Sequence, residues 1–342
     1  MNRKLWRRYP PKIMIVLIYA AACLALWACR EAPMAETTAV TPTVPTKSFA
    51  SSDFPEELKL HLSPWELDAP ALAKADGRVH YYFMCSLGMV IDEDSSYPPK
   101  WGDACLVVFP NGETMLVDSG HDTYAPVLVE NLKRLGVEKL DYVYLSHEHI
   151  DHVGGALTEG GVFDQFPVGK VYWSGLTYPN GHSVREGCEA RGILLKAVRK
   201  GDAIRIGNVR LEVLWPEVYV TPDSTKTVKT QNNMSSVFRL EYGSHSALFP
   251  GDLYVQGEEQ ILQAVGEKLN VDLVKVCHHG QNTSSSEAFV QMVSPKLAVA
   301  TGFVPIAATV EEAYLRTGAE VLFDRYHGYL HVTSDGSDLI YE

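Results

Sequence analysis

Six consecutive residues near the middle of the chain could do metal chemistry. From His147 to His152 the sequence reads His-Glu-His-Ile-Asp-His, which puts three imidazoles and two carboxylates in one short stretch. Unpaired ionisable groups are costly to bury, so this stretch belongs in a cleft rather than in a core. Neutral imidazoles and carboxylates are ligands of divalent metals such as zinc. The pattern therefore predicts a metal site rather than a solvated, histidine-rich loop.

The residues before the motif predict the element that positions it. Residues 140–145 read Leu-Asp-Tyr-Val-Tyr-Leu, and a run this rich in aliphatic and aromatic residues is typical of a buried strand. The motif should then lie at the carboxyl end of that strand, where polar groups can face a cleft.

The motif and several other segments resemble the metallo-β-lactamase fold superfamily, from about residue 79 to the C-terminus. Within it the chain is most similar to the extracytoplasmic hydrolase domain of competence (DNA-uptake) channel proteins and to its free-standing relatives. Besides the motif, the segments that carry the resemblance are Gly102-Asp103-Ala104, Leu116–Gly120, Asn232–Val237 leading to Gly251-Asp252, and Lys275–Gly280.

The resemblance implies an α/β fold, the four-layer αββα metallo-β-lactamase sandwich, with the site along one edge of the sheets. It also implies that His147 and His149 bind one metal and that Asp151 and His152 bind a second. Asp252 would bridge the two metals.

The remaining ligand that the resemblance implies lies in a histidine pair. Strand alternation would point only one of the two into the cleft. We expect His278 to be the ligand, with His279 as a supporting or substrate contact. Asp118 is expected to accept the second N–H of a ligand imidazole, as carboxylates commonly do behind metal-bound histidines.

One ligand of the superfamily pattern is missing. Most members carry a histidine close to the position of Asn232 or Asn233, where this chain has none. The first metal would then be held by two histidines and Asp252, completed by an asparagine oxygen or water. Such a site should be weaker and richer in oxygen than a typical zinc site, which leaves manganese or single-metal occupancy open.

The implied reaction is hydrolysis by a metal-activated hydroxide, with Asp151 and Asp252 as the catalytic carboxylates and two divalent ions, zinc or manganese, as cofactors. No Gly-x-Ser-x-Gly elbow indicates a serine hydrolase. Residues 280–286 could bind a phosphate with backbone N–H groups and the hydroxyl of Ser284, although a plain serine cap on the next helix explains them equally well. We expect a phosphoester or phosphodiester substrate. The alternatives are another ester or lactone hydrolase, or a non-catalytic metal-binding surface protein.

Charge argues against a processive nuclease. The net charge is −12, and residues 1–28 hold five basic and no acidic residues, so their removal leaves −12 − 5 = −17. A body this acidic has no general attraction for nucleic acid. The expected partner is a small or surface-attached phosphoester, and the sequence gives no signal of oligomeric state.

The N-terminus predicts an envelope location. Basic residues precede an uncharged stretch over 13–29 that ends Leu-Trp-Ala-Cys, which resembles a lipobox with Cys29 as the lipidated residue. An uncleaved membrane anchor is the alternative. Either way the expected organisation is 1–29 signal or anchor, 30–78 tether and N-terminal extension, and 79–342 an extracytoplasmic hydrolase domain.

Periodicity and turn signals predict strands alternating with helices after residue 79. The predicted strands are 79–85, 104–109, 113–117, 140–145, 168–173, 193–198, 209–215, 235–242, 245–250, 271–277, 297–301, 320–323, 328–333 and 338–341. The predicted helices are 124–135, 183–191, 256–265, 284–293 and 309–317.

Overall fold

The computed structural model describes residues 72, 75–84, 102–178, 183–218, 227–302, 306–324 and 330–341. The chain divides into two units, Met1–Thr43 and Val44–Glu342, and every described residue belongs to the second. The predicted signal or anchor and the tether up to residue 71 lie outside the described residues. Within the described ranges, no helix is both long enough and apolar enough to cross a bilayer.

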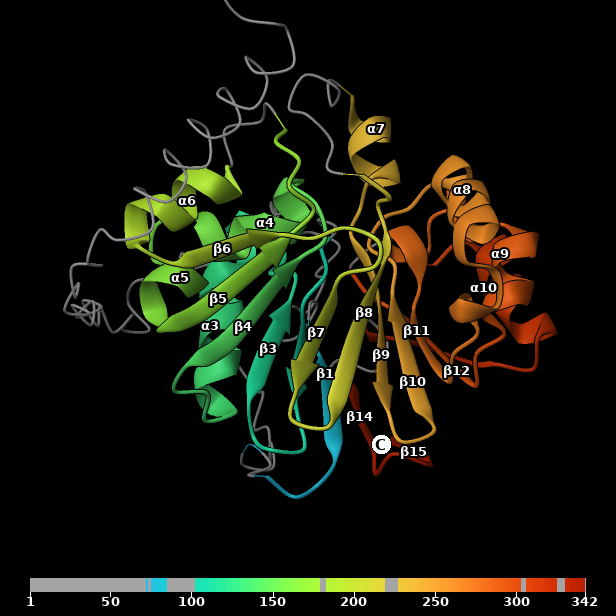
Figure 1. Cartoon of the computed structure of the whole chain (residues 1–342), viewed down its shortest axis with the longest axis horizontal. Helices are drawn as coiled ribbons and strands as arrows, with labels where there is room; N and C mark the ends of the chain where they lie inside the picture. Colours follow the sequence, from blue (N-terminus) through green and yellow to red (C-terminus); the bar gives the residue numbers. More distant parts are fainter. Residues whose placement is uncertain are drawn as a thin grey trace, which may run out of the picture. The chain divides into compact units, whose positions relative to one another are not determined.

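Two mixed sheets form the centre of the second unit (Figure 1). The eight-stranded sheet runs in the order β15 (Leu339–Tyr341), β14 (Leu330–Ser334), β1 (Val79–Phe83), β2 (Cys105–Val108), β3 (Thr114–Val117), β4 (Leu140–Leu145), β5 (Val168–Trp173) and β6 (Leu194–Ala197). The seven-stranded sheet runs in the order β13 (Glu320–Phe323), β12 (Leu297–Ala300), β11 (Leu273–Lys275), β10 (His245–Phe249), β9 (Val237–Tyr242), β8 (Val209–Trp215) and β7 (Ala203–Ile206).

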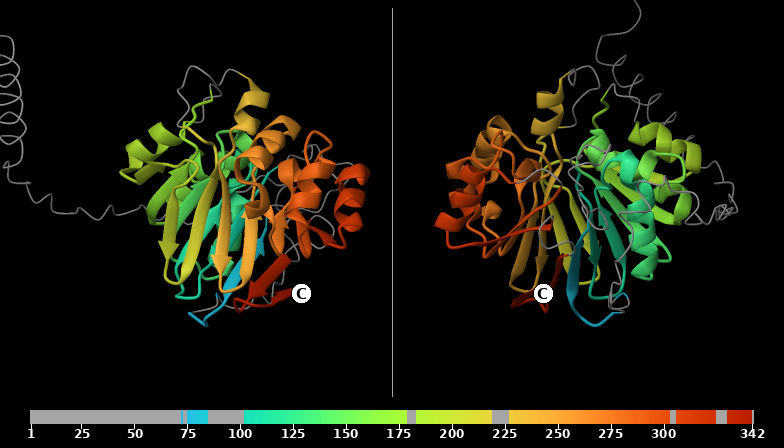
Figure 2. Two further views of the ribbon diagram at one scale, coloured as in Figure 1. Left: turned by 45° about the vertical axis from the view of Figure 1, so that its right-hand side comes forward. Right: turned by 180° about the vertical axis from the view of Figure 1, so that it is seen from behind.

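Helices cover the outer face of each sheet (Figure 2). The eight-stranded sheet carries α3 (Ala125–Arg134), α4 (Ile150–Leu157), α5 (Val162–Gln165) and α6 (Val184–Arg191). The other sheet carries α8 (Val255–Val265), α9 (Glu287–Val293) and α10 (Ala308–Arg316), and the short α7 (Val228–Asn233) packs beside α8. Three short 3-10 helices are η2 (Asp122–Tyr124), η4 (Gly266–Leu269) and η5 (Cys277–Gly280). The predicted αββα sandwich is confirmed.

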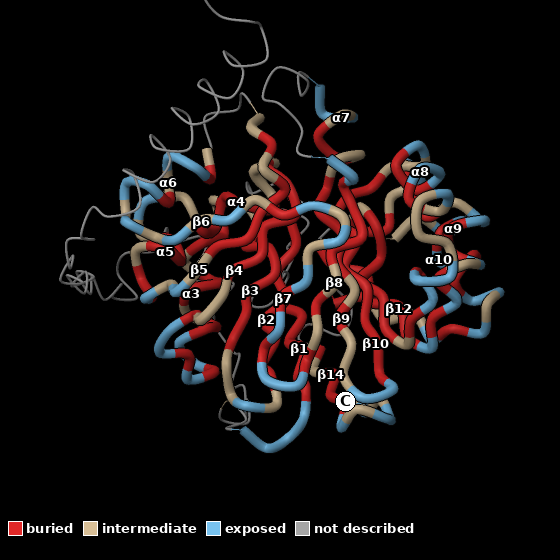
Figure 3. The backbone as a smooth tube through the Cα atoms, in the orientation of Figure 1, coloured by how far each residue is buried: buried red, intermediate tan, exposed pale blue. Residues whose placement is uncertain are grey.

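Buried side chains form three apolar layers, one between the sheets and one beneath each set of helices. Accordingly the inner strands of both sheets are buried along most of their length, whereas the edge strands β6 and β7 carry exposed residues (Figure 3). β4 and β5 lie in the parallel part of the first sheet, and each ends in three buried apolar residues. The sequence predicted both strands with their observed ends.

The carboxyl ends of the parallel strands position the polar segments. β3, β4 and β5 are parallel in the first sheet, and β10, β11 and β12 are parallel in the second. Parallel strands end at the same edge of a sheet, so the residues that follow them gather there. The two edges are joined where the Ser236 N–H donates to the carbonyl of Ser146 at 2.8 Å.

Among the described strands and α-helices, β7, α4, α5 and α7 were not predicted. α4 begins at Ile150, inside the polar motif, where no apolar period marks a helix. β7 did leave a signal, because Ile204 and Ile206 are buried and alternate with exposed residues.

Candidate metal centre

The motif passes from a strand end into a helix. β4 ends at Leu145, and α4 begins at Ile150 with His149 in extended backbone at its N-cap position. Asp151 and His152 therefore lie in the first turn of α4, whereas His147 lies in the loop before it. This arrangement brings the rings of His147 and His152 together, with 4.1 Å between their centroids.

Asp118 anchors the loop between β4 and α4 through hydrogen bonds to Ser146. Its carboxylate accepts the Ser146 N–H at 2.7 Å and the Ser146 hydroxyl at 2.8 Å, and it lies 2.9 Å from Nδ1 of His152. A carboxylate can only accept, so Nδ1 of His152 carries the proton and Nε2 is left to face the site. Asp118 therefore contacts an imidazole that is a candidate metal ligand.

The two glycines after the motif allow α4 to pack closely. A Cβ at Gly154 would lie 2.4 Å from the backbone N of Asp122, and a Cβ at Gly155 would lie 1.9 Å from the carbonyl oxygen of Ser119. No side chain fits in that space. The Gly-Gly pair therefore fixes the start of α4 against the segment that carries Asp118.

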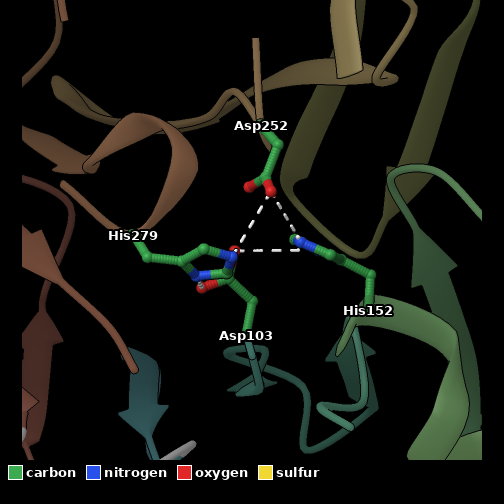
Figure 4. Close-up of side chains that lie close together, drawn as sticks. All are labelled: Asp103, His152, Asp252 and His279. Atoms are coloured by element: carbon green, nitrogen blue, oxygen red, sulfur yellow. Dashed lines mark hydrogen bonds and ion pairs between the residues drawn. The ribbon is translucent and has the colours of Figure 1, made fainter. Parts of the chain in front are cut away.

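Asp252 comes from the second sheet and lies at the centre of the site (Figure 4). Its Oδ2 is 3.1 Å from Nε2 of His152, 3.3 Å from Nε2 of His279 and 3.8 Å from Nε2 of His278. Gly251 precedes it with a positive φ of 59°, which makes the turn out of β10. The N-cap of α8 is Tyr254, so Asp252 does not serve as that cap.

The histidine pair is arranged differently from the prediction. β11 ends at Lys275, and His278 and His279 both have left-handed backbone, with φ of 47° and 54°. Strand alternation therefore does not apply, and both rings turn toward Asp252. His279 is 1% exposed and also lies 3.4 Å from Oδ2 of Asp151, so it occupies the central position that we had expected for His278.

Asp103 is a site residue that the sequence analysis missed. It lies with His152, Asp252 and His279 in a group whose potential ligand atoms are all within 4.8 Å of one another (Figure 4). Its Oδ1 is 3.1 Å from Nδ1 of His279, and its carboxylate also contacts the ammonium of Lys275. The Gly-Asp-Ala segment was noted as part of the resemblance, but nothing local assigned its carboxylate a role.

His147 and His149 form a separate pair of donors. Nε2 of His147 and Nδ1 of His149 are 3.0 Å apart, so two ring nitrogens converge on one point. Nδ1 of His147 contacts the hydroxyls of Ser146 at 3.0 Å and Ser235 at 3.4 Å. The edge of the His149 ring faces Tyr178, with 4.9 Å between ring centroids.

The imidazoles share an orientation that suits metal ligands. In four of them Nδ1 contacts a neighbouring side chain and Nε2 faces the site: His147 with Ser146, His152 with Asp118, His278 with Thr283, and His279 with Asp103. A partner on the second nitrogen is typical of metal-binding histidines. Among the described residues, Nε2 of His149 and Oδ1 of Asp252 are buried without a hydrogen-bond partner, and Nε2 of His152 and of His279 face only carboxylate oxygens of the site. Buried polar atoms normally have partners, so this donor set fits divalent cations.

The two pairs of imidazoles differ in charge. Burial lowers the pKa of His147 well below its usual value and lowers the pKa of His149 to about 4. Burial also opposes charge on His152 and His279, but Asp252 and the other nearby carboxylates outweigh it, so the pKa of each is raised. The same carboxylates that favour a proton there also favour a metal cation.

The remaining predicted site residues differ in position. Asn233 accepts the backbone N–H groups of Tyr254 and Gly257, both at 3.2 Å, and so caps α8 instead of facing the site. In the part of the chain that the structure describes, the buried Oδ1 of Asn232 and the buried hydroxyl of Ser284 have no hydrogen-bond partner. Ser286 accepts the Phe289 N–H as the N-cap of α9, which is the plain capping role that the sequence left open.

Comparison with known proteins identifies the family. The sequence profile described as the metallo-beta-lactamase superfamily matches residues 101–301, more than half of the chain. The chain belongs to the metallo-beta-lactamase superfamily. The site at the sheet edges is therefore the candidate metal centre of a superfamily whose members are generally hydrolases.

Relatives within the superfamily include competence proteins. The chain is 30% identical to ComE operon protein 3 of Bacillus subtilis over 175 residues, which are 51% of this chain and 21% of that protein. It is 30% identical to competence protein ComA of Neisseria gonorrhoeae over 190 residues, 55% of this chain and 24% of that protein. The chain thus matches less than a quarter of either relative.

Among solved structures, the metallo-beta-lactamase fold protein YhfI from Bacillus subtilis is similar in fold. The two share 13% sequence identity, with a TM-score of 0.45, over 77% of this chain and 100% of YhfI.

Proposed function

We propose that this protein is a metal-dependent phosphoester hydrolase that works outside the cytoplasm, tethered to the membrane by its N-terminus. The observation that carries the catalytic part is the position of the Asp252 carboxylate. Three imidazole nitrogens lie within 3.8 Å of it, one from a segment that follows the first sheet and two from a segment that follows a strand of the second. Bound divalent ions, zinc or manganese, would supply charge stabilisation and a hydroxide nucleophile near neutral pH.

The chain's own groups would divide the work. Asp252 and Asp151 would help to hold the divalent ions, together with the imidazoles that lie near the Asp252 carboxylate. Asp103 accepts from Nδ1 of His279, and Asp118 accepts from Nδ1 of His152. The lone pair on Nε2 of each ring would then be available to bind a metal ion. The two sheets therefore supply a preorganised site in which no protein side chain has to act as nucleophile.

Two buried donors support a phosphoester as substrate. Nε2 of Gln281 and the hydroxyl of Ser284 have no hydrogen-bond partner in the described part of the chain. Both lie in the turn that follows His279, and both can donate to phosphate oxygens. Another ester or a lactone is the alternative substrate class.

The acidic body, −17 after loss of residues 1–28, favours a small or surface-attached phosphoester over a long polyanion. Nucleic acid remains the second candidate, because relatives of the chain are named for competence. We expect a small phosphodiester to be cleaved with a higher kcat/KM than linear duplex DNA at physiological salt. DNA cleavage that is efficient and falls steeply with added salt would contradict this.

The decisive experiment combines metal analysis with a substrate panel. The purified domain, reconstituted with zinc or manganese, is assayed with a phosphodiester, a phosphomonoester, a carboxylic ester and a lactone. We expect up to two ions per chain and the highest kcat/KM for a phosphoester. Metal binding without turnover of any substrate would favour the non-catalytic surface protein instead.

The tether is tested separately. Cys29→Ser should abolish lipid attachment and release the protein from membranes. A variant that stays membrane-bound at unchanged apparent mass would favour an uncleaved anchor.

A further inference from the structure

Glu148 is buried in the middle of the metal loop, yet its side chain takes no part in the group around Asp252. It is 0% exposed, and its carboxylate accepts the backbone N–H of Tyr178 at 2.7 Å and that of Val184 at 2.8 Å. Burying a carboxylate is costly unless hydrogen bonds compensate for lost hydration. These two bonds tie Tyr178 and Val184, the two ends of one segment, to Glu148, which lies between the candidate ligands His147 and His149.

Each end of that segment lies against the loop or the helix that follows it. Tyr178 presents its ring to His149 at an interplanar angle of 81°. Val184 begins α6, and α6 packs on α4 so closely that a Cβ at Gly187 would lie 2.4 Å from Leu157. The Glu148 carboxylate therefore fixes where the Tyr178 ring stands relative to the first metal position.

A second buried glutamate provides a matched comparison. Glu258, also 0% exposed, accepts the backbone N–H groups of Ser285 and Ser286. That turn carries Thr283, which contacts Nδ1 of His278 at 2.6 Å. Glu258 thus holds the turn beside His278, whereas Glu148 holds Tyr178 beside His149.

We propose that Glu148 is a positioning residue for substrate selection: it holds Tyr178 as a wall against which the non-reacting substituent of a phosphodiester packs. The inference rests on the proposed phosphoester hydrolysis and names the part of the substrate that the site selects. The Tyr178 ring stands nearly perpendicular to the imidazole of His149, beside the first candidate metal position, and aromatic groups pack well face to edge or offset, so a flat, aromatic substituent suits it. Glu148 acts through Tyr178 and does not touch the reacting atoms.

The first test measures the clamp itself by hydrogen exchange in the metal-loaded protein. In Glu148→Gln one of the two backbone N–H groups faces an amide N–H in place of an oxygen. We expect exchange at Tyr178 and Val184 to become at least about tenfold faster, because local opening sets that rate. Glu258→Gln should change exchange at 285 and 286 instead. Unchanged exchange at 178 and 184 in Glu148→Gln would overturn the clamp.

The second test measures selection. For a bis-aryl phosphodiester, Tyr178→Ala and Glu148→Gln should each raise KM by about tenfold, with kcat within about threefold and metal content unchanged, as expected for loss of uniform binding. Tyr178→Phe should retain the low KM, because it keeps the ring. For a small aliphatic phosphodiester the variants should match the wild type.

The outcomes separate this inference from the function on which it rests. If the wild-type protein cleaves no phosphoester, the proposed function fails. If it does, and Tyr178→Ala keeps the wild-type KM for the aryl substrate, the inference alone is overturned. Loss of metal in Glu148→Gln would also overturn it, because Glu148 would then serve the ligands directly. Tyr178→Ala leaves Glu148 intact and so tests the wall even if Glu148→Gln does not fold.

Discussion

The two candidate metal positions in this site differ in charge. His147 and His149 bring only imidazoles to the first position, and burial lowers the pKa of both. The second position combines Asp151 with His152 and His279, whose pKa values nearby carboxylates raise. Negative charge is therefore concentrated at the second position, and we expect a divalent cation to bind there first.

The two positions also differ in how the chain builds them. Both imidazoles of the first position come from one loop. The second position is assembled from three distant segments, and Asp103 and Asp118 support its rings. The second position therefore has both more carboxylates and more hydrogen bonds that hold its imidazoles in place.

The largest effect tests Asp252, which we expect to serve both positions. In Asp252→Asn we expect affinity for both ions to fall more than about 100-fold, because loss of only a supporting contact already costs about 10–100-fold. Elemental analysis and calorimetric titration with zinc measure this. Retention of one ion at wild-type affinity would show that Asp252 serves a single position.

The second prediction concerns the buried cation behind the second position. The ammonium of Lys275 contacts Asp103 and lies 3.6 Å from Oδ1 of Asp252. Removing one partner of such a buried pair should destabilise the metal-free protein by about 3–5 kcal/mol, because two carboxylates lose their counter-charge. Lys275→Met should lose less stability when zinc is present, since the metal replaces the missing charge.

Urea unfolding with chelator and with zinc measures this difference. Lys296→Met is the control, because Lys296 is exposed and pairs with Asp272 at 2.9 Å. It should cost less than about 1 kcal/mol in either condition. Equal losses for Lys275→Met with and without zinc would contradict a charge role.

The third prediction separates the positions directly. His279→Ala should weaken the tighter binding step by about 100-fold, equivalent to about 2.7 kcal/mol, and leave the weaker step in place. His147→Ala should remove the weaker step and leave the tighter one. Titration of the metal-free protein with zinc resolves the steps. If His147→Ala removed the tighter step, the order of the two positions would be reversed.

The smallest effect comes from the other end of β10. His245, the first residue of β10, is 1% exposed and lies 2.9 Å from the hydroxyl of Tyr81. Burial lowers its pKa from 6.5 to about 4. The unfolded chain then binds the proton more readily, so stability is full above pH 6.5 and falls as pH drops toward 4.

His245 alone should lower the unfolding free energy by about 2 kcal/mol between pH 7.5 and pH 5. His245→Gln can still accept from Tyr81 and should be less acid-sensitive by that amount in urea unfolding. An equal pH dependence in both proteins would assign the acid sensitivity to other groups, among them the imidazoles of the metal centre.

Local pattern was enough to propose the first position, because its expected ligands lie together after a strand rich in aliphatic and aromatic residues. β4, β5 and β8 were predicted with their observed ends. The second position was harder. Asp103 lies 176 residues from His279, and no local pattern reports that they touch. The left-handed backbone of His278 and His279 overrode strand alternation, which had pointed one of them away.

The contact between His152 and Asp252, 3.1 Å across the two sheets, has a consequence for the order of events in biosynthesis. A chain emerging from its N-terminus contains the whole first pair of imidazoles once residue 149 is made. The second position does not exist until residue 279 has been made and the two sheets have docked. Tight metal uptake should therefore be a late step that follows assembly of the sandwich and reports on its completion.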